Sequence, residues 1–244
     1  MKQHEAVIEA MKQLGGYATL GQLYRIAPKI PNCKWETKTP FASIRRIVQE
    51  RAEFFKIKPG LWALASERNH VLKELGIAEN SKPHQVQDFT HYYYQGLAVE
   101  VGNLNGYQTC IPNQDKNKPF LQSKLADVAT LPSCYDFTYK HLVRRAKSID
   151  ATWFNERNLP HAFFEIEHGG DIQNSLLKFV EFQDFRVKFH IVADAVRRSE
   201  FETKIGYNAF VTISKNVKFL SFDALSDWYT KLSELAALQL LTDL

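Results

Sequence analysis

The sequence has few of the residues that mark unusual classes of protein. Of its 244 residues only three are cysteine, nine are proline and eleven are glycine. With 45% hydrophobic and 24% charged residues, the composition excludes a disordered, collagen-like or disulfide-stapled protein and fits one or two globular domains. Because Cys33, Cys110 and Cys134 are far apart and odd in number, we expect neither a disulfide framework nor a zinc-ligand pair.

Long apolar stretches and targeting signals are also missing. No uninterrupted apolar run approaches the roughly 20 residues that a membrane helix needs. The first residues, Met1 to Glu5, lack the basic-then-apolar order of a secretory signal. No P-loop or dinucleotide pattern surrounds Gly169-Gly170, so no nucleotide cofactor is expected. We therefore expect a cytoplasmic protein without a membrane partner.

The positive charge is concentrated at one end of the chain. Residues 1–66 contain 11 Lys and Arg against 5 Asp and Glu, a net charge of +6. The remaining residues contain 20 against 22, a net charge of −2. Such asymmetry is typical of a nucleic-acid contact surface next to a body with another role. A chance excess of charge on a solvated face is the alternative.

The first 66 residues follow the order of a winged helix-turn-helix domain. Apolar spacing predicts a helix over residues 3–14, a second helix capped by Thr19, and a third that begins near Pro40. Two short strands, Phe54–Ile57 and Leu61–Leu64, follow. Three helices and a basic hairpin in this order indicate a winged helix.

In such a domain the third helix enters the major groove and the hairpin lies near phosphates. Arginine and glutamine are suited to reading guanine and adenine edges. The alternative is a winged helix used for protein–protein contact, with solvated arginines. The candidate DNA-binding residues of this domain are Ser43, Arg45, Arg46, Gln49, Lys56 and Lys58.

The rest of the chain reads as a linker and a second domain. Residues 67–86 are mostly polar and predict the linker to a domain over 87–244. An aromatic-rich helix over 87–103 and a strand over Tyr107–Ile111 open this domain. The last helix, about 223–241, carries an apolar stripe that packs in the core or pairs across a twofold axis.

An acidic hairpin is the most informative segment. Residues 147–154 and 160–167 both read as strands, and pairing them places Asp150 opposite Glu165. The period of two puts Glu167 on the same face as Glu165. Convergent carboxylates repel one another and are costly to bury unpaired. Mg²⁺, which prefers hard oxygen ligands, resolves both problems.

The alternative is an exposed sheet face on which Arg144, Arg145 or Arg157 pairs with the three acids. A resemblance to a known family bears on this choice. Ser148-Ile149-Asp150, the run Phe163–His168 and the helix and strand that follow them resemble the PD-(D/E)XK nuclease superfamily. Within it, the chain resembles restriction-endonuclease-like proteins with a Glu-X-Glu motif.

The resemblance implies a fold and a function. The fold is α+β or α/β, with an N-terminal winged helix followed by a restriction-endonuclease-like mixed sheet flanked by helices. The activity is Mg²⁺-dependent hydrolysis of phosphodiester bonds in double-stranded DNA, as by a type II restriction endonuclease. Because such an enzyme cuts two strands, we expect a homodimer. The alternative is a non-catalytic winged-helix DNA-binding regulator with a degenerate nuclease-like domain.

The resemblance also implies roles for individual residues. Asp150 and Glu165 bind Mg²⁺ together with the Ile166 carbonyl. Glu167 stands where lysine is usual and orients or deprotonates the attacking water. A carboxylate does not supply the charge of that lysine, which favours a site with more metal or one without activity. Glu100, on the preceding helix, is a fourth acid or a solvated residue.

Three further polar residues are candidates for contacts with DNA. Asn174 and Lys178 occupy the exposed side of the helix that follows Gly169-Gly170, where a solvated helix face is the alternative. The third candidate is Lys116, in an earlier polar stretch.

Overall fold

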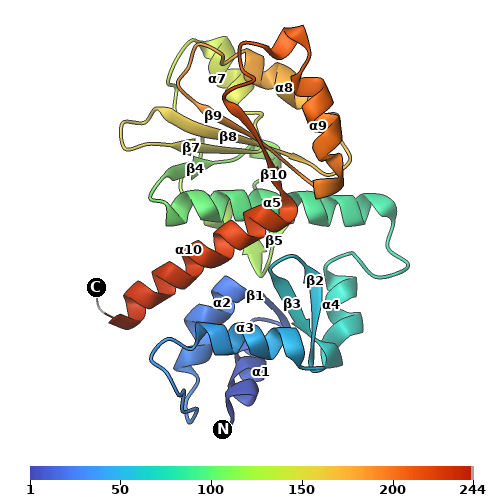
Figure 1. Cartoon of the computed structure of the whole chain (residues 1–244), viewed down its shortest axis with the longest axis vertical. Coiled ribbons are helices and arrows are strands. Elements are labelled where there is room, and N and C mark those ends of the chain that lie inside the picture. The colour runs from blue at the N-terminus through green and yellow to red at the C-terminus, as the bar shows by residue number, and fades with distance from the viewer. Residues whose placement is uncertain (243–244) are drawn as a thin grey trace. The chain divides into compact units, whose positions relative to one another are not determined.

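The computed structural model describes residues 1–242 and divides into two compact units (Figure 1). The first unit is Met1–Val86 together with the residues from Ser226 onward, and the second is Gln87–Leu225. Each unit combines helices with strands, so a mixed α and β class is confirmed. None of the helices in residues 1–242 is long and apolar enough to cross a bilayer.

Helices of the first unit surround a small sheet. The sheet is antiparallel, with strand order β1-β3-β2. Its elements are α1 (Gln3–Gln13), β1 (Tyr17–Thr19), α2 (Leu20–Ile26), α3 (Phe41–Glu50), β2 (Phe54–Lys58), β3 (Leu61–Leu64) and α4 (Arg68–Glu74).

The three predicted helices and two predicted strands of this unit are confirmed, and β1 was not predicted. Thr19 caps α2 as expected, because its side-chain oxygen accepts a hydrogen bond from the Gln22 backbone N–H at 3.2 Å. The Gln22 side chain in turn accepts from the Thr19 backbone N–H at 2.9 Å. This reciprocal capping satisfies two donors that the first turn of a helix leaves free.

The unit boundaries differ from the expected domains in two places. The expected linker contains α4, whose Val71 is fully buried. The helix α10 (Phe222–Thr242) belongs to the first unit from Ser226 onward. Tyr229 and Ala237 are buried there, and the Tyr229 hydroxyl lies 3.3 Å from Thr19 Oγ1. An apolar stripe predicts that a helix is buried, but it carries no information about which partner buries it.

The second unit is built on a five-stranded mixed sheet of order β10-β9-β8-β7-β4. Strands β4, β7 and β8 pair antiparallel, and β8, β9 and β10 pair parallel. The strands are β4 (Gln108–Cys110), β7 (Ala151–Phe154), β8 (Pro160–Glu167), β9 (Lys188–Ala193) and β10 (Val217–Ser221).

Helices flank this sheet on both sides (Figure 1). One of them, α8, forms the crossover that two successive parallel strands, β8 and β9, require. The helices and small hairpin are α5 (Pro83–Leu104), β5 (Pro119–Phe120), β6 (Ser123–Lys124), α6 (Leu125–Val128), α7 (Lys140–Ala146), α8 (Ile172–Val180) and α9 (Arg198–Ile205).

The two faces of the sheet have separate cores because side chains alternate along each strand. Phe163 and Phe189 pack with Phe179 of α8 on one face. On the other face the Trp153 indole N–H donates to the Ala98 carbonyl of α5 at 2.9 Å. This alternation decides which helix the acidic residues of β8 meet.

The expectation of no disulfide is wrong. Cys110 and Cys134 are bonded, with Cα atoms 5.4 Å apart. The segment after α6 returns to β4, where the Leu131 backbone N–H donates to the Thr109 carbonyl at 2.9 Å. The pairing depends on the path of a loop across 24 residues, which spacing in the sequence does not reveal. Cys33 is a free cysteine.

Candidate active site

Three acids meet at one edge of the large sheet. Asp150 immediately precedes β7, and Glu165 and Glu167 lie at the end of β8. Ala151 pairs with Phe164, so the same register places Asp150 opposite Glu165, as the sequence predicts. The acids therefore share the edge at the carboxyl ends of the parallel strands β8 and β9, where ligands bind in open α/β sheets.

Asp150 is held by the main chain and by α5. Its Oδ2 accepts a hydrogen bond from the Ile166 backbone N–H at 2.7 Å. Its own carbonyl accepts from the Gln95 side chain at 2.7 Å, and Gln95 also donates to Asp115 at 3.0 Å. The His91 ring contacts both Ile166 and Asp150. Its Nδ1 lies 3.1 Å from the Ile166 carbonyl oxygen and its Nε2 lies 3.7 Å from Asp150 Oδ1.

Ser175 of α8 connects the two glutamates. Its hydroxyl lies 3.1 Å from Glu165 Oε2 and also contacts Glu167 Oε1. The exposed fractions of Glu165 and Glu167 are only 2% and 8%. The predicted shared face of the glutamates is thus confirmed, but this face is buried under α8 rather than exposed to solvent.

A lysine provides the positive charge in this cluster. Lys178 Nζ lies 2.7 and 2.9 Å from the two carboxylate oxygens of Glu165, and 3.4 Å from the Ser148 carbonyl. It follows Ser175 by three residues, so both point from the same side of α8. The arginine alternative receives no support from Arg145, which instead pairs with Glu181 at the surface.

Burial decides the electrostatics of the site. It raises the pKa of Asp150 and of Glu165, and the negative charge of Asp150 raises the pKa of Glu165 further. Lys178 opposes both shifts without cancelling them. Burial also raises the pKa of Glu167, against the hydrogen bond from Ser175. Burial in this site therefore disfavours the charged forms of the three carboxyl groups.

Arg197 fixes the segment that leaves β8. Its guanidinium donates to the carbonyls of Glu167 at 2.9 Å and Gly170 at 2.7 Å, and it pairs with Glu200. The contacts assign it to the backbone next to Glu167.

The other predicted residues of this unit lie at different distances from the acids. Glu100 is nine residues beyond His91, which places it on the opposite side of α5 from His91. Asn174 is exposed on α8, next to Ser175. Lys116 is half-buried and follows Asp115 in the chain.

The DNA-binding candidates of the first unit belong to α3 and β2. Arg46 and Gln49 are exposed on α3, and Ser43 is half-buried. Arg45 donates to Glu234 of α10 at 2.5 Å and to the Tyr24 hydroxyl at 3.1 Å. On β2, Lys56 is exposed and Lys58 is half-buried.

Four residues of the site were not predicted from the sequence: His91, Gln95, Asp115 and Ser175. A weak signal was present for the first two, since polar residues four apart share a helix face in an otherwise aromatic helix. Asp115 and Ser175 carried no signal, because only the fold brings them to the hairpin.

Residues 1–242 contain no group of three or more His, Cys, Asp and Glu side chains arranged to hold a metal ion. Two carboxylates and a main-chain carbonyl, those of Asp150, Glu165 and Ile166, nevertheless form a set of hard oxygen donors around the edge. The negative charge of Asp150 raises the pKa of Glu165, and a cation between the two carboxylates would relieve this repulsion. The donor chemistry fits a hard divalent cation such as Mg²⁺.

Comparisons with known proteins give one family. No curated protein and no solved structure matches the chain. A family model described as type II restriction enzyme NmeDI C-terminal domain matches residues 68–243. The matched range covers most of the chain and contains Asp150, Glu165 and Lys178. The chain therefore belongs to the family defined by the C-terminal domain of the type II restriction enzyme NmeDI.

Proposed function

We propose that the chain is a Mg²⁺-dependent endonuclease of the PD-(D/E)XK type that hydrolyses phosphodiester bonds in double-stranded DNA. It would act as a type II restriction endonuclease that reads a short sequence. The observation that carries the proposal is the contact between half-buried Lys178 and buried Glu165, opposite Asp150, inside a restriction-enzyme family domain. Acids and a base held together away from water are typical of catalytic sites.

Asp150, Glu165 and the Ile166 carbonyl would hold the cation. When bound, it would stabilise the negative charge that develops on the phosphate and lower the pKa of water. The hydrogen bond from the Ile166 backbone N–H keeps Asp150 Oδ2 at the edge, while Oδ1 faces His91. His91 would turn aside to free the Ile166 carbonyl, which it contacts at 3.1 Å.

Lys178 would take over the charge that a Glu-X-Glu motif lacks. It comes from α8 rather than from β8, and its Nζ reaches the same edge. There it would stabilise the phosphate as negative charge develops. Glu167, oriented by Ser175, would position or deprotonate the attacking water.

For the N-terminal unit we propose a winged helix that binds DNA through α3. Arg46 and Gln49 are exposed on this helix and are suited to base edges. Lys56 and Lys58 on β2 would contact phosphates. Arg45 is already bound by Glu234 and Tyr24, so it would reach DNA only after breaking these contacts.

We expect Arg46→Ala to weaken the affinity for a cleavable duplex by about tenfold, since a base or phosphate contact contributes about 1–3 kcal/mol. Fluorescence anisotropy at fixed salt, with EDTA to prevent cutting, measures the affinity. Lys12→Ala, on the exposed side of α1, is the control of equal charge. Equal affinities of the two variants would show that α3 does not read DNA.

We propose a homodimer, because cutting both strands at a symmetric site needs two active sites. Leu235, Leu240 and Leu241 of α10 are exposed, Leu240 to 66%. Apolar side chains gathered at one helix end are candidates for pairing with a second copy. Light scattering of the complex with a short duplex measures the stoichiometry, and one chain per duplex would exclude this arrangement.

A non-catalytic DNA-binding regulator is the second candidate. It is favoured by the hydrogen bonds and ion pair that already satisfy the acids, and by the lack of a ready group of three metal-binding side chains in residues 1–242. Such a protein would keep the restriction-enzyme fold and bind DNA without cutting it.

Digestion of phage-length DNA, methylated and unmethylated, tests the proposed function. We expect discrete fragments with Mg²⁺ and intact DNA with EDTA. Heterogeneous fragments would indicate a nuclease that reads structure rather than sequence. Intact DNA on both substrates, with a gel shift that reports binding, would favour the regulator.

A further inference from the structure

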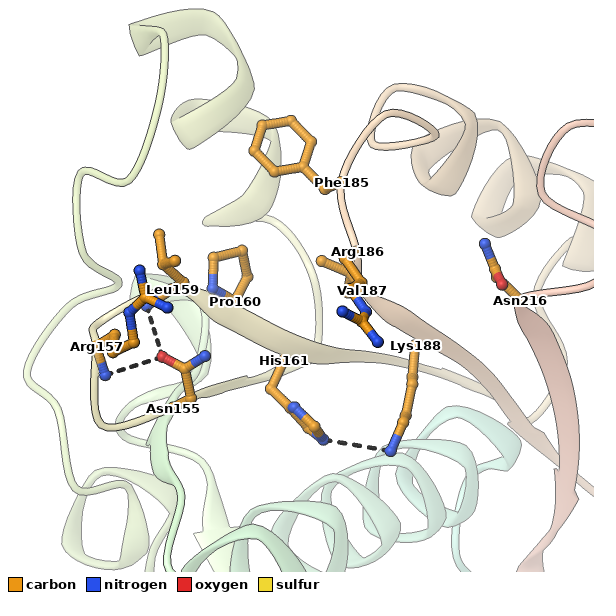
Figure 2. Close-up of a pocket in the computed structure, with 10 residues that line it drawn as sticks. All are labelled: Asn155, Arg157, Leu159, Pro160, His161, Phe185, Arg186, Val187, Lys188 and Asn216. Carbon is orange, nitrogen blue, oxygen red and sulfur yellow. Dashed lines mark hydrogen bonds between the residues drawn. The ribbon is translucent and has the colours of Figure 1, made fainter.

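A concave site lies beside the β7–β8 turn and the start of β9 (Figure 2). It is a cavity of about 700 Å³ where β8 and β9 begin. Glu167 ends β8, six residues beyond His161, so at about 3.3 Å per residue the two lie about 20 Å apart. The cavity is therefore separate from the proposed catalytic edge.

Positive charge dominates the lining of this cavity. Arg157 lies on the turn between β7 and β8, and Arg186 and Lys188 lie at the start of β9 (Figure 2). No carboxylate lines the cavity. In residues 1–242, none of these three cations forms an ion pair with a carboxylate. A concave surface with one sign of charge focuses its field and attracts the opposite charge.

A histidine lies beside one of these cations in the cavity. Lys188 Nζ lies 3.5 Å from His161 Nε2, and burial together with Lys188 lowers the pKa of His161. The His161 ring stacks on Tyr107, with the ring centroids 4.3 Å apart. An imidazole held by stacking is a fixed hydrogen-bonding group beside a lysine.

The cavity also has an apolar wall, and its volume exceeds that of a phosphate group. Four apolar side chains form the wall, and two amide side chains lie near it. A volume of about 700 Å³ falls within the range of small-molecule sites, about 300–1,000 Å³. An apolar wall beside three cations suits a ligand with a flat ring and a phosphate. The wall is Leu159, Pro160, Phe185 and Val187, and the amides are Asn155 and Asn216.

We propose that this cavity binds a 5′-phosphorylated nucleotide. Arg186 and Lys188 hold the phosphate, Arg157 adds positive charge at the rim, and the base packs against Phe185 and the neighbouring apolar wall. The nucleotide is either free or the 5′ end of a DNA strand, since both present the same phosphate and base. Side chains provide all of the charge, so no glycine-rich phosphate loop is required.

Calorimetric titration with dAMP tests this proposal. The full chain is titrated in EDTA, so that cation-dependent binding at the acids does not contribute. We expect dAMP to bind at least tenfold more tightly than deoxyadenosine, because the phosphate makes charge-assisted hydrogen bonds. The double variant Arg186→Ala, Lys188→Ala should lose at least tenfold in dAMP affinity, and Lys215→Ala, an exposed lysine outside the lining, should lose little.

The source of the nucleotide is identified by competition against bound dAMP. Displacement by a 5′-phosphorylated duplex but not by its 5′-hydroxyl form identifies a DNA end, and displacement by neither identifies a free nucleotide. Equal displacement by both duplexes would overturn the proposal in favour of a general backbone-binding surface. So would equal binding of dAMP and deoxyadenosine, or wild-type affinity of the double variant. The substituted residues are exposed, and thermal unfolding verifies that the variants fold.

Discussion

Glu165→Ala should reduce the rate of DNA cleavage by about a thousandfold or more, since it removes a proposed metal ligand and the partner of Lys178. The affinity for DNA in EDTA should stay within about twofold, because the proposed reading helix α3 is untouched. Cleavage rates on a single-site duplex and anisotropy in EDTA measure the two quantities.

The affinity for Mg²⁺ tests separately whether Glu165 acts as a metal ligand. Calorimetric titration with Mg²⁺ should detect binding to the wild-type protein and at least tenfold weaker binding to Glu165→Ala. Glu165→Gln keeps the shape of the side chain and guards against loss of packing, and Glu202→Gln, on the exposed side of α9, is the matched control. Cleavage by Glu165→Ala at the wild-type rate would refute the site assignment.

Lys178→Met should slow cleavage by about a hundredfold, because a positive charge at the developing negative charge of the phosphate contributes about 10²–10³ in rate. Lys178→Arg should recover part of the rate, since it keeps the charge but not the shape. Single-turnover rates under saturating protein separate this effect from weaker binding.

Magnesium binding distinguishes this role from a structural one. Lys178→Met should keep or increase the affinity for Mg²⁺, because it removes a cation from Glu165 while leaving every proposed ligand in place. Lys140→Met, an exposed lysine of α7, should cut normally. If Lys178→Met binds Mg²⁺ and still cuts at the wild-type rate, the lysine only balances charge in the fold.

The acidic hairpin was predictable because its information is local. Asp150 and Glu165 are 15 residues apart, and the period of two together with one turn defines which residues face each other. The bulge at Trp153 and Phe154, between the turn and the acids, was not predictable, but the pairing from Trp153–Ala162 to Ala151–Phe164 has the predicted register. The N-terminal helices were predictable for the same reason, since caps such as Thr19 act within one turn.

Interactions between distant segments set the limit of that reasoning. The sequence placed Lys178 on an exposed helix face, and the structure directs it to Glu165 because α8 crosses back over β8. His91 and Gln95 reach Asp150 only because α5 packs on the sheet, where Gly102 allows a close approach to Trp153.

The sequence alone thus predicted which acids cluster, that they lie at one edge of the sheet, and the order of the helices and strands. Tertiary structure decided which cation lies beside the acids, how Cys110 meets Cys134 and which unit receives the end of α10. The physical reason is range. Periodicity and capping act over a few residues along the chain, whereas ion pairs, disulfides and buried helix faces depend on segments that only the packed core brings together.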